Sequence, residues 1–376
     1  MNKFLKNMTS GANLPRFIIS SFFLLVCIMA VIVKIPFTTL MSDTLVRFAM
    51  NGVLVLAMVP SIQSGLGPNF ALPIGIIAGL VGSVVSFEVG LPGFGGLWLA
   101  IAISVPLAMI LGYLYGQMLN KVKGSELIVS TYTGFSIVSL MSIGWILLPL
   151  KHPEMTWPLG KGLRNIILLD NSFGKMLNDL LSLKYVRVAE TGNLVTFFNR
   201  TDRFITDLYP NNAAVVEFTI PTGLLIFFFL CCFLVYLFNR SKIGMEMRAA
   251  GDNPKFALAS GINVDQMRIL GATISTVIAS IGIVVFSQSY GYLQLYQAPL
   301  FMAFPAIAAI LIGGASTQKA KIFHVIIGTF LFQGLLTMSL PVANKLIVEG
   351  NLSEVLRMII QNGVILYALT KVGGQE

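Results

Sequence analysis

The chain has 376 residues, of which 56% are hydrophobic and only 11% are charged. A soluble domain carries roughly 25% charged residues, so this composition excludes an ordinary soluble protein and indicates an integral membrane protein. The formal net charge of +9 does not indicate nucleic-acid binding, because the basic residues are spread along the chain.

Ten apolar runs are candidates for membrane-spanning helices, which need roughly 17–25 residues each. They lie at 17–35, 45–62, 70–87, 97–119, 127–148, 218–238, 268–287, 301–314, 322–339 and 354–370. No small-residue cleavage site follows the first run, so an uncleaved span is expected rather than a signal peptide. The third and eighth runs are short and interrupted by Pro73 and Pro305. The predicted fold is an all-α polytopic membrane protein with about ten transmembrane helices.

The distribution of lysine and arginine predicts which helix ends face the cytoplasm. With the N-terminus inside, the cytoplasmic segments contain Lys3, Lys6, Arg16, Lys121, Lys123, Arg240, Lys242, Arg248, Lys255, Arg268, Lys319, Lys321 and Lys371. The outer loops at 88–96 and 288–300 contain no lysine or arginine. Because cytoplasmic loops carry the basic excess, both termini are expected in the cytoplasm, with the chain in a bacterial cytoplasmic (inner) membrane.

The long segment 149–217 is expected outside the membrane and has local patterns of its own. Residues 172–183 place apolar side chains on one helical face, and residues 184–198 indicate two strands around Gly192-Asn193. The segment either caps the helix ends or forms a docking platform or gate for a soluble partner.

Without the first and sixth spans, two groups of four remain, at 45–148 and 268–370, in opposite orientations. Each group has a short second member that contains proline. Paired broken helices in inverted repeats are typical of a central transport path, although the prolines could instead kink lipid-packed helices.

The predicted parts are 1–44 (N-terminal segment and first span), 45–148 (first four-helix repeat), 149–217 (outer insertion), 218–267 (sixth span and cytoplasmic coupling loop) and 268–376 (second four-helix repeat and tail).

Small residues recur within the spans at close-packing spacing, at Gly75, Gly79, Gly82, Gly313 and Gly314. The phosphate-binding pattern G-x-x-x-x-G-K-[ST] does not occur, so the chain is not expected to hydrolyse ATP by itself. The three cysteines lie in apolar runs and the two histidines lack ligand spacing. We therefore predict no metal site, no cofactor and no catalytic residues.

The polar stretch MRAAGDNPKFALASGINV, residues 247–264, interrupts the apolar sequence. Asn253 can cap a helix, Pro254 suits the first helical position and Gly261 suits the end, so a short cytoplasmic helix is expected. Its apolar side is formed by Phe256, Leu258 and Ala259. The helix is either a surface for a soluble partner or only a well-capped connector.

This stretch resembles the cytoplasmic coupling region of permease subunits of ABC importers for simple sugars and nucleosides. These are the ribose-type permeases, which are related to branched-chain amino acid permeases. The matching positions are Gly251, Asn253, Ala257, Gly261 and Ile262. Two more segments are similar to the family: FPAIAAILIGGAS at 304–316, and KGSELIVSTYTGFSIVSL at 123–140, which resembles the nucleoside branch. The resemblance covers about 45–148 and 218–370.

The resemblance implies ten helices in inverted halves, two permease subunits around a central path, two cytoplasmic ATPases and an external substrate-binding lipoprotein or periplasmic protein. The polar stretch would then hold a coupling helix that docks in a groove of the ATPase. The residues expected to couple to the ATPase are Gly251, Asn253, Pro254, Ala257, Gly261 and Ile262. The expected partners are the ATPase, a second permease as a homo- or heterodimer, the binding protein and membrane lipid, with no nucleic acid.

The chain departs from the sugar-transporting members at two places in the predicted path. Ala71 stands where these members carry an Asp before the Leu-x-x-Gly of the third span, and Phe304-Pro305 stands where they carry an acidic residue. Either the solute is less hydroxyl-rich than a pentose, or the chain is half of a heterodimer whose partner supplies the polar groups.

The candidate path residues are amides, aromatics and prolines in or beside the broken spans: Asn69, Phe70, Pro73, Gln288, Tyr290, Phe304 and Pro305. They could hydrogen-bond and stack on a planar or sugar-like solute, or the rings could fill helix contacts. The predicted function is the permease subunit of an ATP-driven importer for a small polar solute, a nucleoside or a simple sugar.

An ion-coupled secondary transporter is the alternative, because such proteins also use ten helices in inverted repeats. They usually need acidic residues at membrane depth, whereas Asp43, Glu88, Glu126 and Glu354 lie near the ends of predicted spans. A membrane-embedded enzyme fits least, because no paired carboxylates or Ser/His/Asp grouping occurs at membrane depth.

Overall fold

The structure is a computed structural model that describes residues 14–150, 152–157, 162–188, 194–199, 214–346 and 350–373. Six of its helices are long and apolar enough to cross a membrane: α3 with α4 (Phe37–Gln63), α6 (Gly93–Lys121), α7 (Glu126–Leu147), α10 (Thr222–Arg240), α13 (Val264–Tyr290) and α15 (Ile322–Leu346). Shorter apolar segments lie in α2 (Leu14–Ile32), α5 (Pro73–Val89), α14 (Ala298–Ile312) and α16 (Gly350–Gly373). Each of the predicted apolar runs overlaps one of these helices.

Three predicted boundaries are wrong, two of them because of proline. The second helix, α3 (Phe37–Leu56), begins directly after Pro36 rather than at residue 45, and it is followed by α4 (Met58–Gln63). Pro73 does not interrupt a helix but opens α5, because a residue without an N–H suits the first helical turn. The first residues of the sixth predicted run belong to strand β4 (Ala214–Ile220) instead.

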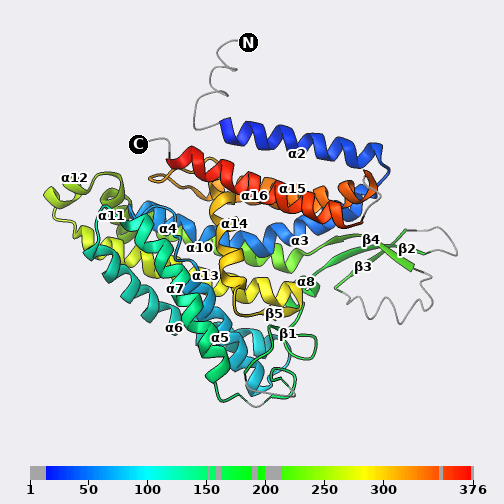
Figure 1. Ribbon diagram of the computed structural model, residues 1–376, viewed down its shortest axis with the longest axis horizontal. Helices are drawn as coiled ribbons and strands as arrows, with labels where there is room; N and C mark the ends of the chain where they lie inside the picture. The colour runs from blue at the N-terminus through cyan, green and yellow to red at the C-terminus, as the bar shows by residue number, and fades with distance from the viewer. Residues whose placement is uncertain are drawn as a thin grey trace, which may run out of the picture.

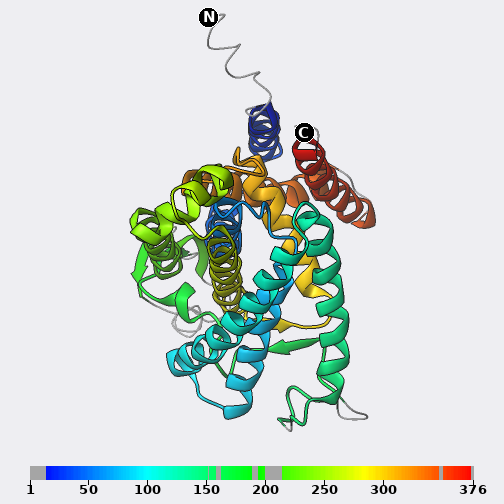
Figure 2. The ribbon, with the colours of Figure 1, turned by 90° about the vertical axis from the view of Figure 1, so that its left-hand side faces the viewer.

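Helix α13 runs through the middle of the helical body and packs against α3, α5 and α6. Helix α15 packs against α2, α3, α14 and α16. Seen from the end that carries α12 (Pro254–Ala259), α2 and α16 lie at the outer edge of the bundle (Figure 2). Helices from the first and second halves of the chain are therefore interleaved around α13 (Figure 1).

Glycines set how closely these helices approach. A Cβ atom added to Gly79 on α5 would overlap the backbone oxygen of Ser280 on α13. A Cβ added to Gly328 on α15 would overlap the backbone oxygen of Ala309 on α14, and one added to Gly313 would overlap the backbone of α15. The predicted close packing at Gly79 and Gly313 is thus confirmed, since only a hydrogen atom fits between these backbones.

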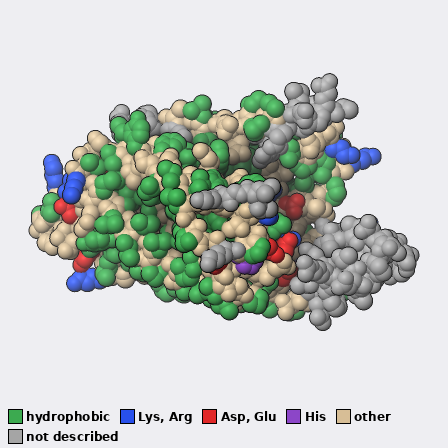
Figure 3. All heavy atoms as spheres, turned by 60° about the horizontal axis from the view of Figure 1, so that its bottom comes forward, with side chains coloured by type: hydrophobic (Ala, Val, Ile, Leu, Met, Phe, Trp, Pro, Cys, Tyr) green, Lys and Arg blue, Asp and Glu red, His purple; other side chains and the backbone are tan. Residues whose placement is uncertain are grey.

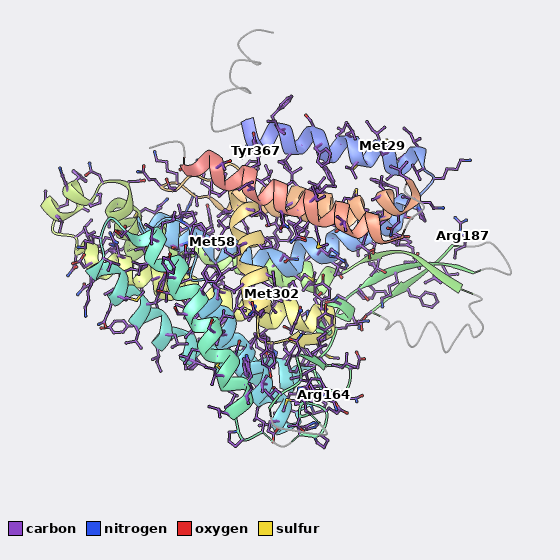
Figure 4. The ribbon with its side chains drawn as sticks, viewed as in Figure 1. Met29, Met58, Arg164, Arg187, Met302 and Tyr367 are labelled. Atoms are coloured by element: carbon purple, nitrogen blue, oxygen red, sulfur yellow. The ribbon has the colours of Figure 1, made fainter. Side chains whose placement is uncertain are left out.

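The outer segment forms two small sheets rather than a separate helical layer. Strand β1 (Ile166–Leu168) pairs antiparallel with β5 (Tyr292–Gln294), and β2 (Leu183–Val188) lies between β3 (Leu194–Phe198) and β4. Figure 4 shows Arg164 beside the first sheet and Arg187 far from it on the second. It also shows Met58 and Met302 within the helical body, away from both sheets.

The two strands predicted in residues 184–198 are confirmed by the antiparallel pairing of β2 with β3, while Gly192-Asn193 between them lies outside the described residues. The predicted helix over 172–183 is reduced to the single turn α8 (Met176–Asp179). Lys175 and Leu181, on either side of this turn, have positive φ angles of 58° and 52°, which a continuing helix does not allow.

The surface has the distribution of side chains expected for a chain in a bilayer. Hydrophobic side chains cover the middle of the face in Figure 3, whereas lysine, arginine and acidic side chains gather toward its ends. Large apolar residues on the helix surfaces are well exposed, among them Leu24, Trp98, Ile110, Leu140 and Phe233. Such a belt is stable only in an apolar solvent, and helices satisfy their backbone polar groups there.

Candidate translocation path and coupling surface

The chain between α4 and α5, residues 64–72, is a non-helical break inside the bundle. At its centre the Asn69 side chain is 2% exposed and donates from Nδ2 to Ser275 Oγ of α13 at 2.9 Å. The Asn69 Oδ1 atom accepts from the backbone N–H of Ala71 at 3.0 Å and from the Tyr115 hydroxyl of α6 at 3.2 Å. One amide thus joins the break to two neighbouring helices.

A serine on α7 completes this network. The Tyr115 hydroxyl and Ser130 Oγ lie 2.8 Å apart, and Ser130 Oγ also accepts from the backbone N–H of Ala71 at 2.8 Å. Both side chains are buried. Irregular backbone at membrane depth is tolerated only where its polar groups find partners, and Asn69 and Ser130 supply two acceptors to the N–H of Ala71.

Three phenylalanines from different elements meet beside the break. The ring centroids of Phe70 and Phe304 lie 6.5 Å apart, and those of Phe135 and Phe304 lie 6.3 Å apart. Phe70 and Phe304 are half-buried, whereas Phe135 on α7 is 42% exposed. We call Phe70, Phe135 and Phe304 the aromatic cluster. Flat apolar faces of this kind can stack on a planar ring that passes between α5, α7 and α14.

The sequence-predicted path residues fall into two groups. Asn69, Phe70, Pro73 and Phe304 lie together at the break, and Pro305 follows Phe304 within α14. Gln288 and Tyr290 lie at the other end of α13, because Ser275, the partner of Asn69, precedes Gln288 by roughly 20 Å of helix.

Gln288 attaches the outer segment to α13. Its Oε1 atom accepts from the backbone N–H of Leu177 at 3.1 Å, and its Nε2 atom donates to Asn178 Oδ1 at 3.3 Å. Its backbone oxygen accepts from the N–H of Lys175 at 2.6 Å. The side chain is fully buried, and both ends of its amide bind α8. Its position fits an anchor of the outer segment better than a side chain lining the path.

The polar stretch 247–264 forms two short helices and the start of a third. Helix α11 (Lys242–Asp252) ends at Asn253, whose side chain accepts from the backbone N–H of Phe256 at 3.1 Å and so caps α12. Pro254 is the first residue of α12, and Gly261 after it has a φ of +81°. The predicted short helix, its cap and its glycine stop are therefore confirmed.

Ala257 faces the chain itself. It is fully buried in a small apolar cluster with Ala250 and Val264. Phe256 and Leu258, in contrast, are 64% and 62% exposed. The surface that α12 offers to a partner is thus made by these two large side chains, while Ala257 fixes α12 against α11 and α13.

The polar stretch 247–264 contacts the break between α4 and α5. A Cβ atom at Gly251 would overlap the backbone oxygen of Gln63, and the backbone of Gly251 also contacts that of Gly65. The Gln63 side chain donates from Nε2 to the backbone oxygen of Ala320 at 2.9 Å. A displacement of α11 would therefore directly move the residues at the end of α4, because their backbones are in contact.

Two ion pairs hold the turn between α6 and α7 to the start of α13. Lys123 Nζ lies 2.5 Å from Asp265 Oδ1, and Arg268 lies 2.5 Å from Glu126 Oε1. Beside α12 they border an open pocket of about 490 Å³. Its lining residues are Lys123, Pro254, Leu258, Gly261, Ile262, Asn263, Val264, Asp265 and Arg268.

Sequence reasoning missed Tyr115, Ser130 and Ser275, which carry the network around Asn69. Each lies among other hydroxyl or amide residues within a predicted span, so the sequence does not single it out. Only the fold shows that Tyr115 and Ser275 bind the Asn69 amide from two helices, and that Ser130 reaches the Tyr115 hydroxyl from a third. In the part of the chain described, no group of three or more His, Cys, Asp or Glu side chains could hold a metal ion.

Comparison with known proteins gives a family match over most of the chain. Residues 40–369 match the model of the permease component of branched-chain amino acid transport systems. The chain is 23% identical over 247 residues to the nucleoside ABC transporter permease protein NupB of Lactococcus lactis subsp. cremoris (strain MG1363), covering 61% of this chain and 60% of that protein.

A second relative is the tyrosine transport system permease protein of Clostridioides difficile (strain R20291). It is 27% identical over 113 residues, which cover 29% of this chain and 38% of that protein. The chain thus spans less than two thirds of the length of both curated relatives. No solved structure matches the chain.

Proposed function

Since the chain belongs to the family of branched-chain amino acid transport permeases, we propose that it is the transmembrane subunit of an ATP-driven ABC importer. In this assembly two permease subunits enclose the solute path, two cytoplasmic ATPases bind α12, and an external binding protein delivers the solute. The six long apolar helices and the four shorter ones would together make ten spans in two inverted halves.

The coupling surface carries this proposal. Helix α12 is held by two caps and a buried alanine, yet it exposes two large apolar side chains, Phe256 and Leu258. A rigid short helix with an apolar outer side is suited to a groove in a soluble partner. The preceding helix α11 contacts the end of α4 through Gly251, so partner motion at α12 can reach the break through α11.

We infer the orientation from the side of the molecule on which α12 lies. The start of α2, the end of α16 and α12 lie toward one side of the molecule, and the sheet β3-β2-β4 lies toward the other (Figure 1). The basic residues of the α12 side, such as Lys242, Arg248 and Lys255, would face the cytoplasm. The outer segment then faces the binding protein.

We infer that the solute carries a planar ring. The aromatic cluster offers flat faces at the break, and the residues around it provide neutral hydrogen-bonding groups rather than carboxylates. The two curated relatives are named for a nucleoside and for tyrosine, both of which contain a planar ring. A ring solute also agrees with the presence of Ala71 and Phe304 where sugar transporters carry acidic residues.

Uptake should depend on ATP and not on an ion gradient. The complex isolated through a tag on this chain would be reconstituted in proteoliposomes and supplied with labelled uridine or L-tyrosine. We expect uptake to continue when ionophores collapse the proton and sodium gradients, and the chain alone to release no phosphate from ATP. Loss of uptake with ATP still present would indicate an ion-coupled transporter instead.

Replacing Phe304 with alanine should reduce uptake of a ring solute about tenfold, because stacking on one aromatic side chain is worth roughly 1–3 kcal/mol. Phe304 contacts both other rings of the aromatic cluster. Phe301→Ala on the same helix is the matched control, since Phe301 is 72% exposed and should tolerate the change. Phe304→Tyr should restore uptake; equal uptake by all variants would exclude the aromatic cluster from the path.

A further inference from the structure

Helix α3 carries two ionisable residues, Asp43 and Arg47, within an otherwise uncharged span. They are four residues apart and so lie on the same side of the helix. Charged residues within a membrane-spanning helix are costly, and they are retained where they face a water-filled cavity and act on a solute or ion.

These two side chains do face a cavity. A pocket of about 210 Å³ lies between α3 and the outer end of α13. Its lining residues are Asp43, Val46, Arg47, Met50, Ser289 and Tyr290. A second pocket, of about 270 Å³, shares Asp43 and Val46 with the first and extends to Lys175 and Asp179 of the outer segment. The two pockets adjoin at Asp43 and Val46, which line both.

One hydroxyl of the first pocket has no hydrogen-bond partner in the described part of the chain. Ser289 is only 6% exposed, yet its Oγ atom has no hydrogen-bond partner. A buried hydroxyl without a partner is costly, so such a group in a native fold calls for an explanation.

Neither charged side chain of this pocket forms an ion pair with a described residue. The Arg47 guanidinium lies 5.9 Å from the centre of the Tyr290 ring, a cation–π contact, and forms no ion pair with any carboxylate of the described residues. Asp43 likewise forms no ion pair with Arg47 or with any other described cation. The pocket therefore presents a donor cation, an acceptor anion and a free hydroxyl beside an aromatic wall.

We propose that Asp43, Arg47, Ser289 and Tyr290 form a recognition site at the outer mouth of the path, which binds the polar edge of the planar-ring solute. Arg47 donates hydrogen bonds to carbonyl or carboxylate oxygens, and Asp43 accepts from hydroxyl or amino groups. Ser289 supplies the third contact, and Tyr290 forms the wall. This inference rests on the proposed importer function and adds a first binding step outside the aromatic cluster.

The experiment measures uptake of labelled uridine and of L-tyrosine by the reconstituted transporter at limiting and saturating solute. Ser289→Ala removes a hydroxyl that has no protein partner, so we expect normal membrane abundance and unchanged thermal stability. Uptake at limiting solute should nevertheless fall about threefold. Arg47→Gln should lower it about tenfold or more, with partial recovery in Arg47→Lys.

Asp43→Asn distinguishes the two ring solutes. A zwitterion would place its ammonium at Asp43, so its uptake should fall about tenfold, whereas a neutral nucleoside should lose only about threefold. Lys345→Gln, which removes an exposed cation at the end of α15, is the matched control and should leave uptake unchanged.

The outcomes separate this site from the proposed function. If Ser289→Ala and Arg47→Gln transport both solutes as the wild type does while Phe304→Ala is impaired, the recognition site is absent and the importer function stands. If the wild type transports neither solute with ATP, the proposed function is wrong and this site falls with it.

Discussion

We expect Gly328→Leu to abolish accumulation of the folded chain in membranes. Gly328 lies where α15 crosses α14, and even a Cβ atom there would overlap the backbone oxygen of Ala309 and approach the N–H of Gly313 to 2.8 Å. Ordinary overpacking costs roughly 1–3 kcal/mol because flexible side chains move aside. Here the obstacle is backbone on a facing helix, so the helices themselves must separate and the expected cost is larger.

The amount of monodisperse protein is measured by size-exclusion chromatography of a fluorescent fusion in detergent. Gly363→Leu on α16 is the matched control, since no other atom lies within 4 Å of a Cβ added there. This control should accumulate like the wild type. A normal elution profile for Gly328→Leu would mean that α14 and α15 do not pack as described.

The helical body could be predicted from the sequence because long apolar runs indicate segments that lie in lipid rather than in water. Every predicted run overlaps a helix, since a chain in lipid has few other ways to satisfy its backbone. The helix ends were less predictable. Hydropathy placed the start of the second span at residue 45. The helix begins at Phe37 instead, directly after Pro36, which is its N-cap residue.

That error of eight residues had a functional consequence. With the span starting at 45, Asp43 appeared to lie outside the membrane and Arg47 at its edge. The helix from Phe37 instead carries both residues along one side, facing Tyr290 across a pocket. The charged pair could have been found by treating Pro36 as a helix start and counting from there.

The site at the break was partly predictable. Broken spans pointed to Asn69, Phe70 and Phe304, which the fold brings together. The same reasoning joined them to Gln288 and Tyr290, which lie at the far end of α13. A linear sequence shows that two residues are polar or aromatic, but not which residues from other helices will use their hydrogen bonds, as α8 uses those of Gln288.

Helix α12 was also predictable only in part. Its cap, first proline and terminal glycine follow from local chemistry and could be predicted. Which side of a six-residue helix faces the rest of the chain depends on tertiary packing. Ala257 lies on the inner side, with Ala250 and Val264, and the exposed side belongs to Phe256 and Leu258.

Replacing both exposed residues, Phe256→Asp with Leu258→Asp, should release the ATPase and abolish uptake. Two large apolar side chains at the centre of an interface typically contribute at least about 2 kcal/mol each, and a carboxylate desolvated without a partner adds a further cost. We expect normal abundance of the chain, because neither side chain is buried within it. Co-purification of the ATPase through a tag on this chain measures the loss.

Two further variants separate loss of docking from loss of folding. Gln266→Asp adds one negative charge nearby, half the change of the double variant, at an exposed position in the first turn of α13 where an acid is favourable, and should retain the ATPase. Ala257→Asp buries an unpaired carboxylate between α11 and α13 and should lower the stability of the chain by about 3–5 kcal/mol. If the double variant keeps its ATPase and full uptake, α12 is only a connector, since its exposed side would then have no partner to lose.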